Sequence, residues 1–224
     1  MDQEARERVM KALQAEALAQ GDPTGWFEPL YQAAGRSDLQ VPWDDGTPNP
    51  HLVQWLDRTA IDGRGLRALE VGCGMGHGAR ALAERGFHVT AVDLSHSAID
   101  QARRRNAHER IAFQQGNMLE PPKEFLGAFD LVVEIYTLQA IPADQRAQLT
   151  RVLPTLLAPG GQLWVVCRAR DEEVVPTGPP WALAESELRA LAQPASDLEL
   201  VTLDRFVDQE DPARDRFRAL LRRP

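Results

Sequence analysis

The chain has 224 residues, which is long enough for one domain with a substantial buried core. Its apolar fraction is 43%, no segment approaches the ~18 apolar residues of a membrane span, and the formal net charge of −8 argues against a broad nucleic-acid surface. Two cysteines, Cys73 and Cys167, suggest no disulfide framework, and the first residues lack the apolar run of a signal peptide. We therefore expect a cytoplasmic protein with neither a nucleic-acid nor a membrane partner.

Helices and loops are predicted for the first sixty residues. Residues 2–20 carry apolar side chains at helical spacing, and Gly21-Asp-Pro23 ends that helix. Pro23 can open a second, short helix, because proline is tolerated in a first turn. Proline and glycine punctuate the segment 35–50, which is predicted as a loop, and a third helix then runs to about residue 60.

Strands and helices alternate after residue 65. Strands are predicted at 66–71, 87–93, 110–114, 129–134 and 161–168, and helices at 77–86, 95–107, 142–157 and 184–193. Such alternation implies right-handed crossovers and a mainly parallel sheet. The last two strands, 198–206 and 215–221, are joined too closely for a helical crossover and are predicted to be antiparallel. The expected fold is α/β: a Rossmann-like, doubly wound, seven-stranded sheet with an antiparallel C-terminal strand and an N-terminal helical lid.

Four glycines follow the first predicted strand, at positions 72, 74, 76 and 78. Glycine there lets the backbone turn sharply and lets a ligand approach bare main chain, while the N-terminal amides of the next helix face the loop. The second strand ends in Asp93, a carboxylate placed to accept both hydroxyls of a ribose. This combination predicts an adenosine-type cofactor.

Two kinds of cofactor fit a glycine loop and an acidic strand end. The motif of a dinucleotide site is Gly-x-Gly-x-x-Gly. If the motif starts at Gly72, His77 stands in place of the third glycine. If it starts at Gly74, Ala79 stands there, which is a permitted substitute. Glu70 lies two residues before the first glycine, where its charge would repel a pyrophosphate and attract an ammonium group. A nicotinamide-dependent oxidoreductase is therefore the weaker alternative, and the antiparallel tail also disfavours it.

The glycine loop resembles the Glu/Asp-x-Gly-x-Gly-x-Gly signature of class I S-adenosylmethionine-dependent methyltransferases. Five segments of the chain match motifs of this family and follow in the family's order. They are Glu70-Val-Gly-Cys-Gly-Met-Gly76, Asp93-Leu-Ser, Gly116-Asn-Met-Leu119, Phe129-Asp-Leu-Val-Val-Glu134 and Leu156-Leu-Ala-Pro-Gly-Gly161. The resemblance spans about residues 45–222 and implies S-adenosyl-L-methionine as cofactor and S-adenosyl-L-homocysteine as product. The cofactor-binding residues that it implies are Glu70, Gly72, Cys73, Gly74, Gly76, His77, Asp93, Leu94, Asn117, Met118, Leu119 and Glu134.

The resemblance also implies roles for single residues. Glu70 and the glycine loop would hold the methionine end and Asp93 the ribose. Many relatives carry an aspartate at the position of Asn117; the amide oxygen of Asn117 can still accept from the adenine amine, or a backbone carbonyl or another side chain does so. Three roles are open for Glu134: it contacts the methionine amino group, it faces the pocket, or it is a solvated strand end. His77 touches the cofactor carboxylate or simply begins a helix.

The N-terminal segment carries a second resemblance. Two segments are similar to the N-terminal lead-in of thiopurine, thiol, halide and tellurite methyltransferases: Trp26-Phe-Glu-Pro-Leu-Tyr31 and Val41-Pro-Trp-Asp-Asp-Gly-Thr-Pro-Asn-Pro50. General bacterial small-molecule methyltransferases share this lead-in. The resemblance implies that residues 1–45 form a helical lid over the substrate and that 46–224 form the cofactor-binding domain. Trp43 would belong to the lid and Asp44 would shape the turn. The alternative is that Trp43 only packs a loop onto the core.

Aromatic and cationic side chains are the candidates for the acceptor pocket. They are Trp26, Tyr31, Trp43, Tyr136, Arg168 and Trp181. Tyr136 follows the fourth strand, where a substrate pocket of this family would open, and Arg168 and Trp181 could cover an anionic substrate. The alternatives are a packed tyrosine and an ordinary exposed arginine.

These features together predict methyl transfer from S-adenosylmethionine to a small-molecule nucleophile, with an S-, O-, N- or halide acceptor. Displacement at an activated methyl group needs mainly alignment of the reactants, so we expect neither a dedicated catalytic residue nor a metal site. A non-catalytic cofactor-binding sensor or subunit is the alternative from a different class. The sequence leaves both a monomer and a homodimer open, with the first helix as a lid or a dimer contact.

Overall fold

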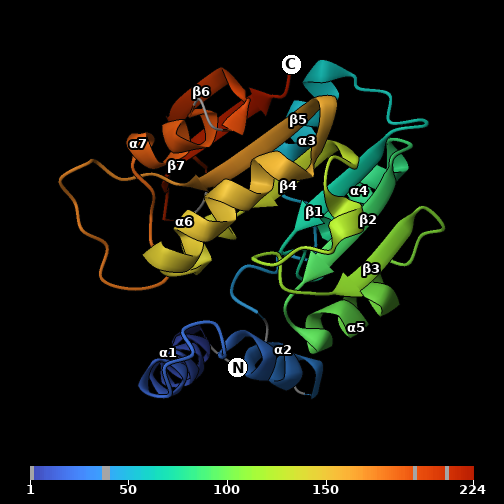
Figure 1. Ribbon diagram of the computed structural model, residues 1–224. Coiled ribbons are helices and arrows are strands. Elements are labelled where there is room, and N and C mark those ends of the chain that lie inside the picture. The colour runs from blue at the N-terminus through green and yellow to red at the C-terminus, as the bar shows by residue number, and fades with distance from the viewer. Residues whose placement is uncertain (1–2, 37–40, 194–195, 210–211) are drawn as a thin grey trace.

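A seven-stranded sheet of order β3-β2-β1-β4-β5-β7-β6 forms the centre of the protein (Figure 1). The computed structural model describes residues 3–36, 41–193, 196–209 and 212–224. The strands are β1 (Arg67–Val71), β2 (His88–Asp93), β3 (Ile111–Gln115), β4 (Phe129–Ile135), β5 (Leu157–Arg168), β6 (Glu199–Val207) and β7 (Asp215–Arg222). Strands β1 to β5 pair in parallel, whereas β7 runs antiparallel to both β5 and β6.

Helices cover both faces of this sheet. They are α1 (Gln3–Ala19), α2 (Phe27–Arg36), α3 (Pro50–Thr59), α4 (His77–Glu84), α5 (His96–Arg105), α6 (Ala143–Val152) and α7 (Glu185–Arg189). Apolar side chains of α3, α4 and α5 pack on one face, and those of α6 and α7 pack on the other. Helices α1 and α2 lie past the end of the sheet, where they share an apolar cluster with α5 and the loop after β1 (Figure 1). Within the described ranges, no helix is long and apolar enough to cross a bilayer.

Strand β5 shows how one strand supports both layers. Trp164 and Val166 contribute to the apolar cluster under α3 and α4, whereas Val165 and Cys167 contribute to the cluster under α6 and α7. All four side chains are fully buried. Successive residues of a strand point to opposite faces, so a strand that is covered on both sides appears in the sequence as a continuous apolar run.

The predicted fold class is confirmed, whereas several element boundaries differ from the prediction. The helix predicted over 142–157 ends at Val152, because Pro154 lacks the N–H that would continue the α-helix, and a 3-10 turn follows. Strand β5 begins at Leu157, earlier than predicted, because Leu157 pairs with Phe129 across a register shift. Apolar periodicity does not reveal such an irregular pairing.

The N-terminal helices also form, although α2 begins later than Pro23. Pro23 lies in the preceding turn, where its carbonyl accepts a hydrogen bond from Nε1 of Trp26 at 3.1 Å. Residues 37–40 of the predicted loop lie outside the described residues, and α3 begins at Pro50 with Asn49 as its N-cap. The division of the chain into 1–45 and 46–224 stays a prediction.

Helix α2 is anchored to the N-terminus of α5 by Glu28. The Glu28 carboxylate accepts hydrogen bonds from the hydroxyls of Ser95 and Ser97, both at 2.6 Å, and from the backbone N–H of Ser97 at 3.1 Å. A carboxylate is stabilised at the N-terminus of a helix, because unpaired N–H groups and the helix dipole both favour a negative charge there. This contact fixes α2 next to the end of β2.

Candidate active site

The loop Gly72–Gly76 between β1 and α4, hereafter the glycine loop, has a backbone that side chains would obstruct. Gly72 and Gly74 have φ values of +67° and +51°. A Cβ atom on Gly72 would lie 2.2 Å from Oγ1 of Thr137, and that hydroxyl donates a hydrogen bond to the Val71 carbonyl at 3.0 Å. Glycine is therefore required at position 72 for both conformation and space.

Asp93 at the end of β2 is bonded to the main chain on both sides. Its Oδ2 accepts from the Gly74 N–H at 2.8 Å and its Oδ1 from the Ser95 N–H at 2.9 Å. Burial raises the pKa of this carboxyl, and the two N–H donors oppose the rise. A carboxylate has about four lone pairs, so Asp93 can accept from further donors such as the hydroxyls of a ribose.

Glu70 on β1 lies beneath the start of α4. Its Oε2 accepts from the backbone N–H of Ala79 at 2.7 Å, and a Cβ atom on Gly78 would lie 2.0 Å from its Oε1. Burial raises the pKa of Glu70 to about 8. A dinucleotide site places its pyrophosphate at the corresponding helix N-terminus. Here the Glu70 side chain takes that position. Its predicted contact with the cofactor stays a prediction.

Glu134 near the end of β4 is fully buried, so its interpretation as a solvated strand end is wrong. Its Oε1 accepts from the backbone N–H groups of Thr137 at 2.6 Å and Leu138 at 2.9 Å. Its Oε2 is buried and has no hydrogen-bond partner among the described residues. Burial raises the pKa of Glu134 to about 7.

The segment predicted to border the adenine follows β3. The Asn117 side chain is exposed, and its Oδ1 accepts from the Leu119 N–H at 3.0 Å, which closes a tight turn. Met118 is buried between them, while Leu94 after β2 is 42% exposed. Cys73 in the glycine loop is buried, with burial raising its pKa, as expected of a small apolar residue. The cofactor contacts of these residues stay predictions.

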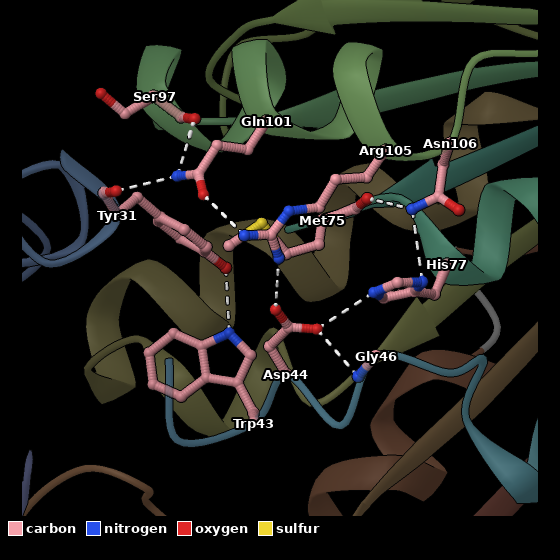
Figure 2. Close-up of polar contacts among 10 residues, drawn as sticks. All are labelled: Tyr31, Trp43, Asp44, Gly46, Met75, His77, Ser97, Gln101, Arg105 and Asn106. Atoms are coloured by element: carbon pink, nitrogen blue, oxygen red, sulfur yellow. Dashed lines mark hydrogen bonds and ion pairs between the residues drawn. The ribbon is translucent and has the colours of Figure 1, made fainter. Parts of the chain in front are cut away.

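An aromatic cover lies over the glycine loop. Trp43 Nε1 donates to the hydroxyl of Tyr31 at 2.9 Å, as Figure 2 shows, and that hydroxyl lies 2.8 Å from where a Cβ on Gly74 would be. Tyr31 and Trp26 are buried, whereas Trp43 is 40% exposed and meets Trp26 edge-on with ring centroids 5.7 Å apart. Tyr31 and Trp43 thus come together at the loop, and Trp26 supports them from behind.

Tyr136 and Arg168 lie on the ends of neighbouring strands. Tyr136 follows β4 with a left-handed φ of +64°, and its N–H bonds to Val166 of β5. Arg168 ends β5, opposite Arg216 of β7. The Arg216 guanidinium lies 4.6 Å from the centroid of the Tyr136 ring, within cation–π range.

Trp181 joins the same end of the sheet through Gln139. The Trp181 N–H donates to the Gln139 carbonyl at 2.6 Å, and the Gln139 side chain accepts from the Arg168 N–H. Trp181 is half-buried. The candidates for the acceptor pocket therefore form two groups, one at the glycine loop and one at the ends of β4 and β5.

Several polar residues at this end of the molecule escaped the sequence analysis. Arg216 is buried and pairs with Asp208, with Nε and Oδ2 2.6 Å apart. Arg105 ends a run of three arginines that is typical of a solvated helix face, yet its side chain reaches Asp44 at 3.0 Å. Asn106 bonds to the glycine loop. Of these residues, only Asp44 could be singled out from the sequence, because it lies in a proline-rich stretch. The contacts of Arg216, Arg105 and Asn106 join segments that are distant in the chain.

The strand order, the glycine loop and the acidic ends of β1 and β2 define a class I S-adenosylmethionine-dependent methyltransferase. Within that class, the chain belongs to the thiopurine S-methyltransferase family, whose sequence model matches residues 35–217.

Named relatives agree with this class. Ubiquinone biosynthesis O-methyltransferase of Aromatoleum aromaticum is 29% identical over 145 residues, which is 64% of this chain and 54% of the relative. The enzyme of the same name from Marinobacter nauticus is 29% identical over 157 residues, 67% of this chain and 58% of the relative. The chain thus spans about half the length of these curated relatives.

Solved structures share the fold. The N-methyltransferase NodS from Bradyrhizobium japonicum, in complex with S-adenosylhomocysteine, matches with a TM-score of 0.66 and 24% identity, over 87% of this chain and 98% of that one. An S-adenosylmethionine-dependent methyltransferase from Anabaena variabilis matches with a TM-score of 0.72 and 16% identity, over 88% of this chain and 93% of that one. At these identities the likeness concerns the fold alone.

Proposed function

We propose that the chain transfers a methyl group from S-adenosylmethionine to a small-molecule nucleophile. The observation that supports this most is the Glu70 carboxylate at the start of α4, where a dinucleotide would need its pyrophosphate. Glu70, Asp93 and Glu134 put three buried carboxylates near the ends of β1, β2 and β4. A cationic ligand would offset the free-energy cost of burying these carboxylates in their ionised form. S-adenosylmethionine carries two positive charges, on its ammonium group and on its sulfonium.

When bound, S-adenosylmethionine supplies an electrophilic methyl group on a positively charged sulfur. The residues of this chain bind and orient the donor and exclude water. Gly72 and Gly74 allow the left-handed turns of the loop, Asp93 takes the ribose hydroxyls, and Tyr31 and Trp43 cover the loop. No residue is assigned to acid–base chemistry, because alignment of the reactants and shielding from water supply much of the rate of such a displacement.

The proposed acceptor is a thiol, a halide, a phenol or an amine. The family match that covers most of the chain is to sulfur methyltransferases, whereas the named relatives and the NodS structure concern oxygen and nitrogen acceptors. A screen should therefore begin with aromatic and aliphatic thiols. Tyr136, Arg168 and Trp181 are the proposed acceptor-side residues, because they lie together at the ends of β4 and β5.

Calorimetric titration with S-adenosylmethionine, S-adenosylhomocysteine and NADH tests the cofactor. Binding of both sulfur ligands and not NADH is expected, whereas binding of NADH alone would contradict the proposal. The acceptor panel then separates an enzyme from a sensor. S-adenosylhomocysteine formation with any acceptor supports methyl transfer, and tight binding without turnover across the panel favours a non-catalytic sensor or subunit.

Glu70→Gln separates two roles of this side chain. The amide oxygen can still accept from the Ala79 N–H, so the start of α4 is kept, while the side chain can no longer ionise beside a cationic ligand. We expect about ten-fold weaker binding of S-adenosylmethionine, since a hydrogen bond to a charged group is worth roughly 1.5–3 kcal/mol. Calorimetry measures the affinity, with Glu84→Gln at the other end of α4 as the matched control. Equal affinity in both variants would show that Glu70 serves only the helix.

A further inference from the structure

We propose that Asp44 is a positioning residue that clamps the segment 41–49, hereafter the strap, over the glycine loop and so sets how fast the cofactor leaves. The inference rests on the proposed function, because it takes S-adenosylmethionine as the ligand beneath the strap. It assigns different tasks to two adjacent residues. Trp43 covers the loop, and Asp44 holds the cover in place.

Asp44 receives three donors from three different elements (Figure 2). Oδ1 lies 3.1 Å from the Gly46 N–H of the strap and 3.0 Å from Nε2 of His77, the first residue of α4. Oδ2 lies 3.0 Å from Nη1 of Arg105, the last residue of α5. The His77 contact, with help from Gly46 and Arg105, lowers the pKa of this buried carboxyl, so it stays charged at neutral pH.

The His77 ring continues the contact to the glycine loop. Asn106 Nδ2 lies 2.7 Å from the Met75 carbonyl of the loop and 3.2 Å from Nδ1 of His77. Because Nδ2 can only donate, Nδ1 of His77 accepts, and the ring proton sits on Nε2, where it donates to Asp44. The strap and the floor of the cofactor site are thus joined by one chain of hydrogen bonds.

Other anchors of the cover do not depend on Asp44. Gln101 Nε2 donates to the Tyr31 carbonyl at 2.8 Å, and Glu28 holds α2 to the N-terminus of α5. Removal of Asp44 therefore frees the strap while α2 keeps its place. The Trp43–Tyr31 bond would then be the main polar contact between strap and α2 over the loop.

The first experiment compares Asp44→Ala with Asp45→Asn. Asp45 is the exposed neighbour in the strap and provides the matched loss of charge. Dissociation of S-adenosylmethionine is followed by stopped-flow tryptophan fluorescence, and affinity and stoichiometry by calorimetry. We expect Asp44→Ala to release the cofactor about ten-fold faster, because a charge-assisted contact is lost, with one ligand bound per chain. Asp45→Asn should behave like the wild type.

The stoichiometry excludes a simple folding defect. A partly unfolded protein binds fewer ligands per chain with unchanged affinity, whereas a freed strap changes the dissociation rate at full stoichiometry. His77→Ala removes one of the two contacts that Asp44 makes outside the strap and leaves the Arg105 contact, so it should speed release by no more than Asp44→Ala does. The double variant should release no faster than Asp44→Ala alone. Additive effects, or equal release from wild type and Asp44→Ala, would overturn the proposal.

Hydrogen exchange of the free protein gives a readout without ligand. Amides of the strap should exchange about ten-fold faster in Asp44→Ala than in Asp45→Asn, while amides of α3 keep their rates. Equal strap exchange in the two variants would contradict the clamp. If the wild type bound no S-adenosylmethionine, the proposed function would fail instead, and exchange would still report whether the clamp exists.

Discussion

Asp93→Ala is expected to weaken the binding of S-adenosylmethionine about 1,000-fold, the largest effect of any single change at the site. Alanine removes the carboxylate that would accept hydrogen bonds from the two ribose hydroxyls. The carboxylate also accepts from the Gly74 and Ser95 N–H groups, which alanine leaves unpaired in a buried place. Each unpaired buried donor costs roughly 1–3 kcal/mol, so the free protein should also be less stable.

Calorimetry at high protein concentration measures the affinity, and chemical denaturation measures the stability. Asp100→Ala on the surface of α5 is the control, because it removes a carboxylate that pairs with His96 on the same helix. A loss of stability without a loss of affinity would mean that Asp93 only ties the glycine loop to β2. A ribose role requires that the affinity falls, whereas the stability should fall in either case because the Gly74 and Ser95 N–H groups lose their acceptor.

Glu134→Gln is expected to stabilise the free protein above neutral pH. Burial raises the pKa of Glu134 from 4.5 to about 7, so the folded state keeps the proton that the unfolded state releases. The stabilisation by that proton is complete below about pH 4.5 and is lost as the pH rises to about 7. A shift of this size corresponds to about 3 kcal/mol.

Glutamine keeps the oxygen that accepts from the Thr137 and Leu138 N–H groups and cannot ionise. Denaturant unfolding of both proteins at pH 5 and pH 8 tests the expectation. The wild type should lose about 2.5 kcal/mol more than the variant between these values, because the stabilisation is already incomplete at pH 5. Glu70 has a raised pKa in both proteins and cancels in the comparison. Parallel pH dependence would mean that Glu134 is ionised in the folded state.

Much of the cofactor side of the site was predictable from local sequence. Glycines at 72, 74 and 76 follow a buried strand, and Asp93 ends the next one, so their proximity follows from parallel pairing of β1 and β2. Glu70 was predicted to discourage a pyrophosphate, and its carboxylate takes the N-terminus of α4. These residues are close in the chain, or are brought together by one pairing rule.

Contacts between distant segments were not predictable. Arg105 belongs to a run of arginines that is typical of a solvated helix face, and only the packing of the strap against α5 makes it a partner of Asp44. Glu134 at a strand end was compatible with exposure, whereas in the folded protein it is buried and bonded to the turn after β4. Composition and periodicity carry no information about which loop covers which strand end.

The sequence by itself determined the order of strands and helices along the chain, the glycine loop and the acidic ends of β1 and β2. Apolar periodicity and glycine positions influence the backbone over only a few residues, so they can be interpreted without the tertiary structure. The tertiary structure alone decided the early start of β5, the pairing of Arg216 with Asp208 and the clamp of Asp44 on His77 and Arg105. These depend on register, burial and the meeting of segments far apart in the chain. Such features arise only when the whole core packs.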